Sequence, residues 1–361
     1  MRGFFIANKI RNFILQYFNM TQYSFRNDYS EGAHEKILKA ISENNLVQEE
    51  GYGEDNISIK AAGLIRERTG NPDADVHFVS GGTQANLIVI SALLKPHESV
   101  IAPATGHITV HEAGAIEATG HKINAVETKD GKLRITDIQK EIDFHEDEHM
   151  VLPKMVFISN STETGCIYTK TELQELSECC KSKNLILYLD GARLGSALTS
   201  DKNDLTLKEI SDLVDIFYIG GTKNGALLGE AIVINKAELK DHFRFHLKQK
   251  GALLAKGRVI GAQFLELFKD DLYFELSKHA NTMAMKLAKG IKEAGHEFFT
   301  EPSTNQIFPI LPIALIEKLS QKFGFYLWRK TEDDKAIIRL VTSWATKEEA
   351  VDSFIDELQK Y

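Results

Sequence analysis

Cysteine, surplus positive charge and long apolar runs are scarce in this sequence, and each shortage excludes a class of protein. Its 361 residues include three cysteines, Cys166, Cys179 and Cys180, which form neither a CxxC pair nor a metal-binding spacing. An odd number of cysteines in so long a chain favours a reducing compartment, so we expect a cytoplasmic protein. The formal net charge of −8 argues against nucleic acid and anionic membranes as partners. We therefore expect a small ligand and no transmembrane span.

Acidic residues are missing from residues 1–19, which are basic and aromatic. A secretory signal needs an uninterrupted apolar centre, but Lys9 and Arg11 interrupt the run and no small-residue cleavage site follows. Three interpretations stay open: an amphipathic membrane-surface helix, a transit peptide, or an upstream start codon with the protein beginning at Met20. We treat residues 1–19 as an N-terminal extension of unknown role.

Apolar residues are plentiful, in short segments that alternate with helical patterns. The hydrophobic fraction is 43% and the charged fraction 26%, as in a globular protein with an ample core. Strands are expected at residues 76–79, 99–101, 122–126, 155–159, 185–189 and 216–219. Apolar strands separated by helices predict an α/β fold with a mainly parallel sheet that is covered on both faces.

The pattern changes after about Lys250. Helical patterns dominate from Leu253 to Ala294, and strand-like segments and a helix over Lys347–Tyr361 follow. This order predicts a smaller α+β domain. We expect a large domain over residues 20–250 and a small C-terminal domain over residues 251–361.

One lysine stands just after an apolar strand. Residues 215–229 read DIFYIGGTKNGALLG, so the expected strand is followed by Lys223 in a glycine-flanked turn. A lysine in a groove lined by backbone can be desolvated enough to act as a neutral amine and form a Schiff base with a carbonyl cofactor. On this stretch alone, a solvated turn lysine is the alternative.

A second turn has the outline of an anion site. The strand over residues 76–79 continues into SGGTQAN (residues 80–86), and a helix is expected over Leu87–Leu94. Gly81 and Gly82 would let a phosphate approach the backbone, where free N–H groups and the helix dipole favour negative charge. The alternative is a simple strand-to-helix turn with Thr83 as the N-cap.

Asp190 closes an apolar strand, where an unpaired carboxylate is costly. Arg193 is one candidate partner, and a protonated pyridine nitrogen is a better one. Ligands of parallel sheets bind outside the carboxyl ends of the strands, and the turn at Gly81, Asp190 and Lys223 all fall at such ends. Together with a histidine that can stack, these residues are the parts needed to hold pyridoxal phosphate.

The sequence also resembles a known family. The matching segments are YGED at Tyr52, GGTQANL at Gly81, HITVHEAG at His107, DGAR at Asp190, GGTKNG at Gly220 and IRLVTSW at Ile338. They are similar to motifs of the threonine aldolase branch of the aromatic amino acid β-eliminating lyases, over nearly everything from Tyr23 to Tyr361. The resemblance implies a pyridoxal 5′-phosphate enzyme with the aspartate aminotransferase-like fold (fold type I), a large mainly parallel sheet domain and a smaller α+β domain.

The resemblance implies roles for five cofactor-binding residues. Lys223 would hold the cofactor as a Schiff base, and Asp190 would pair with the pyridine nitrogen. Gly82 and Thr83 would hold the phosphate. His107, five residues before Glu112, would stack on the ring. Lys223, His107 and Asp190 are therefore the expected catalytic residues.

The resemblance also implies how the substrate is held. Arg193 would reach the cofactor's phenolic oxygen or the substrate. Arg339 would grip the substrate's α-carboxylate in a two-pronged pair, for which a guanidinium is suited. The family often has a serine soon after an N-terminal arginine, where it helps to bind that carboxylate. Here the position after Arg26 is Asn27, whose amide can still donate a hydrogen bond.

Two further features of the family have no fixed position here. A loop histidine lies near the substrate's β-hydroxyl in the family, and His145 and His149 are the candidates. A basic loop, often from a neighbouring subunit, adds a cation to the phosphate, and Lys248, Lys256 and Arg258 are the candidates. We do not choose among them.

The function expected from these features is retro-aldol cleavage of L-threonine or L-allo-threonine to glycine and acetaldehyde. A β-eliminating lyase acting on a cysteine- or serine-like substrate is a rival, as is a non-catalytic carrier of pyridoxal phosphate, although a carrier would not need Arg339. An interaction protein without cofactor would explain none of the strand-end residues. We also expect a homodimer or homotetramer with shared active sites, from the resemblance and from Tyr52 in the glycine-rich loop 49–56.

Overall fold

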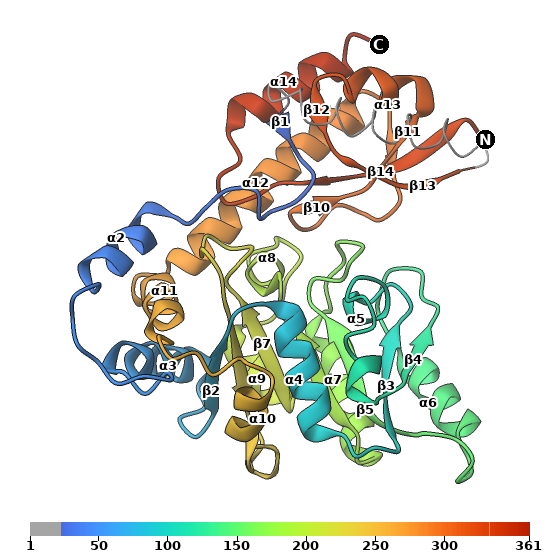
Figure 1. Cartoon of the computed structure of the whole chain (residues 1–361). Helices are drawn as coiled ribbons and strands as arrows, with labels where there is room; N and C mark the ends of the chain where they lie inside the picture. Colours follow the sequence, from blue (N-terminus) through green and yellow to red (C-terminus); the bar gives the residue numbers. More distant parts are fainter. Residues whose placement is uncertain (1–22, 332) are drawn as a thin grey trace, which may run out of the picture.

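The computed structural model describes residues 23–331 and 333–361, which form a seven-stranded, a five-stranded and a two-stranded β-sheet with their helices (Figure 1). The larger sheet has seven strands in the order β2-β8-β7-β6-β5-β3-β4. They are β2 (Asp75–Val79), β3 (Glu98–Pro103), β4 (Ile123–Val126), β5 (Leu152–Ser159), β6 (Ile186–Asp190), β7 (Ile216–Gly220) and β8 (Glu230–Ile234). Neighbouring strands are parallel except where β8 pairs with β2 and β7. The predicted mainly parallel sheet is confirmed, and residues 1–19 lie outside the described residues.

The strands of this sheet are apolar because helices and side chains bury both of its faces. On β7, Ile216 and Tyr218 belong to the core on one face, whereas Phe217 and Ile219 belong to the core on the other. None of the four is more than 1% exposed, and full burial of such a side chain stabilises the fold by about 1.5–3 kcal/mol. A strand with no solvated face reads as a continuous apolar run.

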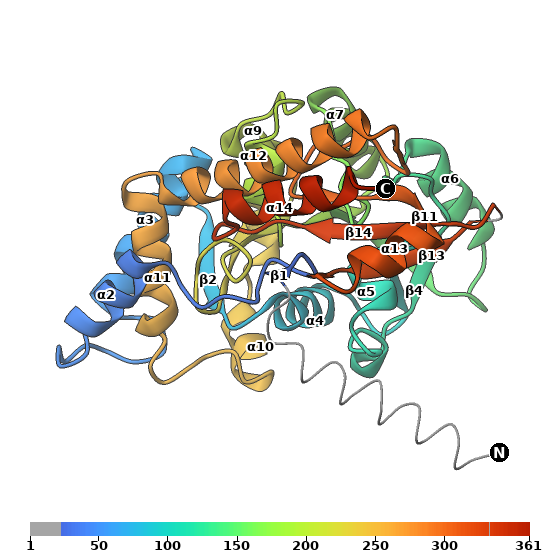
Figure 2. The same ribbon diagram turned by 90° about the horizontal axis from the view of Figure 1, so that it is seen from above.

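Helices cover both faces of the larger sheet (Figure 2). They are α2 (Glu35–Glu43), α3 (Asn56–Thr69), α4 (Gly82–Leu93), α5 (His107–Val110), α6 (Ile135–Phe144), α7 (Lys170–Ser182), α8 (Leu194–Leu198), α9 (Leu207–Leu213), α10 (Phe243–Gln249) and α11 (Arg258–Lys269). Residues of α3, α7, α9 and α11 join one core, and residues of α4 and α10 join the other. Within residues 23–331 and 333–361, no helix combines the length and apolar character that crossing a membrane requires.

The C-terminal part consists of a five-stranded sheet, the strand β12 outside that sheet, and three helices. Its elements are β9 (Glu297–Phe298), β10 (Gln306–Ile307), β11 (Pro309–Pro312), β12 (Phe323–Gly324), β13 (Tyr326–Lys330) and β14 (Lys335–Val341), with α12 (Leu272–Glu293), α13 (Ile313–Leu319) and α14 (Glu348–Leu358). β14 pairs antiparallel with β10, β11 and β13. β1 (Tyr23–Ser24) pairs with β12, so the first described residues lie beside this part. Conversely, α11 packs in the core of the larger sheet. The expected division at residue 250 stays a prediction.

The carboxyl ends of β5, β6 and β7 face the C-terminal part (Figure 1). Ser159, Asp190 and Gly220 are the last residues of these three strands. Open parallel sheets bind ligands at this edge, because the loops there diverge and leave polar backbone groups accessible. The residues that the sequence singles out therefore meet at the junction of the two parts.

Candidate active site

A cavity of about 650 Å³ lies at this edge of the larger sheet and extends to β13 and β14. Its volume is that of a small-molecule or cofactor site. Seven residues expected from the sequence line it: Gly82, Thr83, His107, Asp190, Arg193, Lys223 and Arg339. Strand ends and loops that lie far apart in the sequence thus supply one site.

Lys223 enters the cavity from the turn after β7. A Cβ on Gly220 would lie 2.4 Å from the backbone oxygen of Ala192, so only glycine fits where these two turns touch. The Nζ of Lys223 has no hydrogen bond or ion pair with another described residue. Burial, followed by the positive charge of Arg193, lowers the pKa of Lys223. This environment differs from that of a solvated turn lysine, because it favours the neutral amine that reacts with carbonyl groups.

Asp190 ends β6 with 3% of its surface exposed. Its Oδ1 accepts hydrogen bonds from the Tyr218 hydroxyl at 2.5 Å and from the Ala192 N–H at 2.9 Å. Its Oδ2 accepts a longer bond from Asn86 Nδ2 at 3.3 Å. None of the residues that the structure describes forms an ion pair with Asp190, and Arg193, one of the two partners considered from the sequence, is paired elsewhere. The carboxylate is held in place but not neutralised, which suits a cationic ligand.

Arg193 makes a two-pronged pair with Asp28. Its Nε donates to Oδ2 at 2.7 Å and its Nη2 donates to Oδ1 at 3.0 Å. The side chain of Asn305 donates to the same carboxylate at 2.9 Å. Burial by itself would raise the pKa of Asp28, but the charges of Arg193 and then Lys223 outweigh it and lower the pKa. Asp28 was not predicted from the sequence, where its one signal was its place beside Asn27 in the segment compared with the family.

His107 is fixed by a chain of hydrogen bonds. It is the first residue of α5, and its Nδ1 lies 2.8 Å from Oε1 of the buried Glu112. Asn86 donates to that oxygen at 2.7 Å and also to Asp190, and it accepts a bond from the Tyr188 hydroxyl at 2.7 Å. The chain connects the predicted ring-stacking residue with the predicted partner of the ring nitrogen. Side chains linked in this way hold one another's orientation.

The N-terminus of α4 opens into the cavity. No side chain caps it: Gly81 is the N-cap, and Gly82 and Thr83 are the first two helical residues. Thr83 is therefore not the N-cap that the alternative interpretation required. A Cβ on Gly82 would lie 3.0 Å from the Tyr218 hydroxyl, so the backbone approaches the site closely here. Uncapped N–H groups at the positive end of a helix dipole form an anion site.

Two glutamates in the cavity, the half-buried Glu163 and the buried Glu230, were not predicted. Glu163 Oε1 accepts hydrogen bonds from Ser159 Oγ at 2.8 Å and from the His107 N–H at 3.0 Å, while its buried Oε2 has no partner. Burial, and then the charge of Asp190, raises the pKa of Glu163. Glu230 accepts a bond from the Gly221 N–H at 2.8 Å, and burial raises its pKa to about 7. Their signal was their position, since one follows β5 and the other begins β8.

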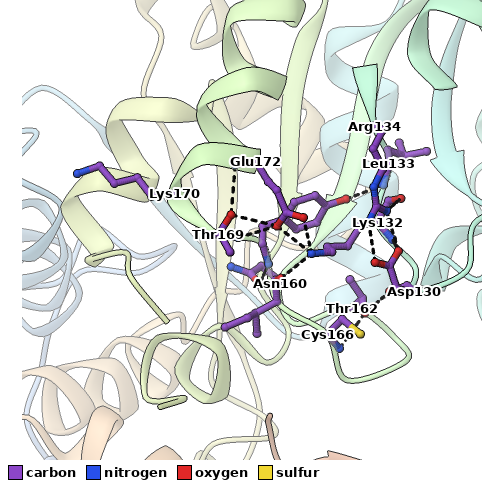
Figure 3. A network of polar contacts seen from close by, with 12 residues as sticks. Asp130, Lys132, Leu133, Arg134, Asn160, Thr162, Cys166, Thr169, Lys170 and Glu172 are labelled. Carbon is purple, nitrogen blue, oxygen red and sulfur yellow. Dashed lines mark hydrogen bonds and ion pairs between the residues drawn. The ribbon is translucent and has the colours of Figure 1, made fainter. Parts of the chain in front are cut away.

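A polar network fixes the loop that carries Glu163 (Figure 3). Thr162 and Thr164 both donate to the backbone oxygen of Asp130, at 3.0 and 2.7 Å. Lys132 Nζ donates to both carboxylate oxygens of Glu172 at 2.6 and 2.8 Å. These bonds connect the segment before α6 with the loop after β5 and the start of α7. The loop is thus held by residues that do not line the cavity.

Arg339 projects from β14 into the far side of the cavity. Its guanidinium lies 5.2 Å from the ring centre of Tyr326 and 5.7 Å from that of Trp328. It forms no ion pair with the residues described, its buried Nε has no partner, and its Nη2 makes a 3.4 Å bond to the Arg26 backbone oxygen. Burial, followed by the charge of Arg193, lowers the pKa of Arg339. Aromatic rings orient this cation, and its free N–H groups suit a carboxylate ligand.

Asn27 is the one expected site residue that does not line the cavity. Its Oδ1 accepts bonds from the Tyr29 N–H at 3.0 Å and from Ser30 Oγ at 2.9 Å. This local turn leaves Tyr29, two residues on, at the cavity wall. The role implied for Asn27 stays a prediction.

The candidate loop residues also lie outside this chain's cavity. His145 is buried with its Nδ1 at 2.7 Å from the Glu141 oxygen, and His149 is exposed. Among the basic candidates, Lys248 stacks on the Tyr52 ring at 4.6 Å, Arg258 donates to the backbone oxygen of Val47, and Lys256 is exposed. One chain alone therefore brings none of these five groups to the site.

Comparison with known sequences gives a consistent result. The sequence model described as β-eliminating lyase matches residues 25–313. A low-specificity L-threonine aldolase of Pseudomonas aeruginosa is 31% identical over 334 residues, which are 91% of this chain and 94% of that protein.

Two solved structures extend the comparison. A structure titled as Leishmania major threonine aldolase superimposes with a TM-score of 0.92 at 50% identity, covering 94% of this chain and 99% of the other. An aspartate aminotransferase of Thermus thermophilus has a TM-score of 0.73 at 14% identity, covering 98% of this chain and 95% of the other. The second likeness shows the fold alone, and it confirms the predicted aspartate aminotransferase-like fold.

Proposed function

The chain belongs to the β-eliminating lyase family, and from that premise we propose that it is a pyridoxal 5′-phosphate-dependent aldehyde-lyase. It cleaves L-threonine and L-allo-threonine to glycine and acetaldehyde. The observation that carries the proposal is one cavity that brings together Lys223, Asp190 and Arg339, none of which forms an ion pair with another described residue. These groups suit an aldehyde, a cationic ring and a carboxylate.

The cavity fits the cofactor. Lys223 supplies an amine, Asp190 supplies a carboxylate for the pyridine nitrogen, and the uncapped N-terminus of α4 supplies N–H groups for the phosphate. When bound to Lys223 as a Schiff base, pyridoxal phosphate supplies an electron sink for the pair released as the Cα–Cβ bond breaks.

The polar residues of the cavity prepare this chemistry. The lowered pKa of Lys223 makes its amine a better nucleophile near neutral pH. Tyr218 and the Ala192 N–H hold Asp190 so that its charge keeps a proton on the ring nitrogen. Charge that is fixed in advance in a buried site stabilises a transition state more than charge in water does. His107, held by Glu112, is placed to stack on the ring.

Two arginines are placed to bind the substrate or the phenolic oxygen of the cofactor. Arg339, held between Tyr326 and Trp328, binds the α-carboxylate and so orients the substrate. Arg193 is fixed by Asp28 through Nε and Nη2, which leaves Nη1 for the cofactor's phenolic oxygen or the substrate. A carrier of pyridoxal phosphate would need neither an oriented carboxylate site nor this pair.

Product analysis separates the two enzyme functions. The purified protein loaded with pyridoxal phosphate is incubated with L-threonine, L-allo-threonine and L-cysteine. Acetaldehyde with an equal amount of glycine supports the aldolase. Pyruvate from L-cysteine without acetaldehyde would favour the β-eliminating lyase, and no product from any of the three would favour the carrier.

The substrate is a small amino acid, and the active protein is a homodimer or homotetramer with shared sites. Large apolar side chains that lie exposed support this assembly: Leu46 is 92% exposed, Phe245 75% and Tyr52 44%. Lys248, Lys256 or Arg258 would then reach a neighbouring subunit's phosphate site. Sedimentation that finds a fully active monomer would exclude shared sites.

The proposed location is the cytoplasm. Cys166, Cys179 and Cys180 are all free thiols, as a reducing compartment allows. Fractionation of cells that express the natural protein tests this location.

A further inference from the structure

We propose that His111 is the catalytic residue that accepts the proton of the substrate's β-hydroxyl, a role that rests on the proposed function. His111 follows the last residue of α5 and lines the cavity together with His107, Lys223 and Arg339. The family comparison led us to expect a loop histidine for this step, at His145 or His149. Neither of these two lines this chain's cavity.

The geometry of α5 places two imidazoles side by side. His107 and His111 are one helical turn apart, and their ring centres lie 5.6 Å from each other with planes tilted by 54°. His107 is fixed through Nδ1 by Glu112. Neither ring nitrogen of His111 bonds to another described residue. One imidazole is therefore committed to a structural contact, and the other is free to accept a proton from a ligand.

The charges around His111 favour its neutral form. Burial lowers the pKa of His111, and the positive charges of His107, Arg339, Lys223 and Arg193 lower it further. A neutral imidazole has the lone pair that a general base needs. The same arginine, Arg339, binds the α-carboxylate in the proposed function, so His111 lies on the substrate's side of the cavity.

Glu163 is the competing base inside the cavity, and two observations disfavour it. Its Oε1 already accepts two hydrogen bonds, from Ser159 and from the His107 N–H, and only the buried Oε2 lacks a partner among the described residues. Its pKa is raised by burial and by the charge of Asp190, so at a given pH a larger fraction of it is protonated than of an ordinary glutamate. A protonated carboxyl donates a hydrogen bond but cannot take the hydroxyl proton. His111 is the better acceptor.

The atoms and electrons of the step balance with His111, the substrate and water. His111 takes the proton from the β-hydroxyl, and the O–H electron pair forms the second bond of the aldehyde carbonyl. The Cα–Cβ bond breaks, and its electron pair stays with Cα. Cα then takes one proton from water, which completes glycine, and the hydroxide so formed accepts the proton from His111, so that no net proton is gained or lost. His111 lines the cavity and is exposed, so water can reach it.

The test compares two reactions of the same loaded enzyme. His111→Asn keeps a polar side chain of similar shape but has no basic nitrogen. Cleavage of L-threonine should fall about 10²- to 10⁴-fold. Exchange of the α-protons of glycine with D₂O, followed by NMR, should persist at the wild-type rate, because glycine has no β-hydroxyl. Urea unfolding of the apoprotein and the visible absorption band of the bound cofactor should not change.

Three variants serve as comparisons. His97→Asn, in an exposed loop outside the cavity, controls for loss of a histidine and should cleave like wild type. His111→Gln should repeat the effect of His111→Asn with a longer amide. His149→Asn should leave the ratio of cleavage to exchange unchanged if His111 is the base.

Several results would overturn the assignment. Wild-type cleavage by His111→Asn would remove His111 from the step, and equal losses of cleavage and exchange would indicate a structural role. If His149→Asn, and not His111→Asn, selectively lost cleavage, His149 of a neighbouring subunit would be the base. If the wild-type enzyme exchanges glycine protons but releases no acetaldehyde from L-threonine, the proposed function fails first, and the role of His111 with it.

Discussion

The two sides of the cavity are built in different ways. On the side of the larger sheet, Asp190 ends the buried strand β6 and Lys223 lies in the turn after the buried strand β7, so the backbone fixes where they lie. On the other side, Asp28 comes from the N-terminal segment and Arg339 from β14. Asp28 is held in place by its ion pair with the side chain of Arg193. A site residue on the first side can be replaced without loosening the scaffold. A site residue on the second side is also part of the contact between the two parts.

The first way to test this contrast is Lys223→Ala, with the largest expected effect. Turnover of L-threonine should be abolished, together with the visible absorption band of lysine-bound pyridoxal phosphate. The urea midpoint of the apoprotein should not fall, because removing a buried lysine without a partner removes a desolvation cost. Spectra, kinetics and urea unfolding measure the three effects. Lys181→Ala, on the exposed face of α7, is the matched control, and a band that survives borohydride reduction and dialysis would contradict the assignment.

The second test removes an ion pair on the other side of the cavity. Asp28→Asn removes the charge that pairs with the buried Arg193, and breaking a buried ion pair costs about 3–5 kcal/mol of unfolding free energy. Turnover should fall as well, because Arg193 loses its orientation. Asp130→Asn is the matched control, since its two-pronged pair with Arg134 lies at the surface, where such pairs contribute about 0–1 kcal/mol. Equal losses of stability in the two variants would contradict the contrast.

The sequence predicted the first side better than the second, for a physical reason. Two-sided burial makes β6 and β7 apolar without interruption, so the polar residue that ends each run stands out. Asp190 and Lys223 needed no knowledge of the tertiary structure. Asp28 and Arg193 are 165 positions apart, and no local period relates them. Arg339 was reached only through the resemblance to the family.

Residues that act through other residues were the hardest to predict. Asn86 belongs to GGTQANL and Glu112 to HITVHEAG, yet their hydrogen bonds to Asp190 and His107 depend on how α4 and α5 pack. The length of α4 was also misjudged, because glycines predict a turn although here Gly82 begins the helix. The expected boundary of the domains at residue 250 stays untested, and so do the roles of the individual site residues.

A third test asks how much of substrate binding depends on the second side. Arg339→Ala should raise KM for L-threonine at least tens-fold, since losing a buried charge-assisted pair costs about 2–5 kcal/mol. The affinity for pyridoxal phosphate should change little, because the contact is with the substrate. Arg329→Ala is the matched control: it also removes an arginine of this sheet that stacks on an aromatic ring, Phe299, but it lies outside the cavity. An unchanged KM would remove Arg339 from the site.

The smallest expected effect concerns Glu230, on the first side. Its pKa in the folded protein is about 7, above the ordinary value of 4.5, chiefly because of burial. Below pH 4.5 both the folded and unfolded chains keep the proton. As the pH rises from 4.5 to 7, the unfolded chain releases it first, so the stability of the folded protein falls through this window and stays low above it. The loss amounts to about 3 kcal/mol at most.

Glu230→Gln removes this titration while it keeps the size of the side chain. The variant should therefore gain stability over the wild type between pH 5 and pH 8, measured as the difference between their urea midpoints in the apoprotein at each pH. Glu178→Gln, on the exposed face of α7, controls for the loss of one negative charge. A gap between Glu230→Gln and wild type that is the same at both pH values would mean that Glu230 does not titrate between pH 5 and pH 8. The raised pKa assigned to its buried carboxyl would then be wrong.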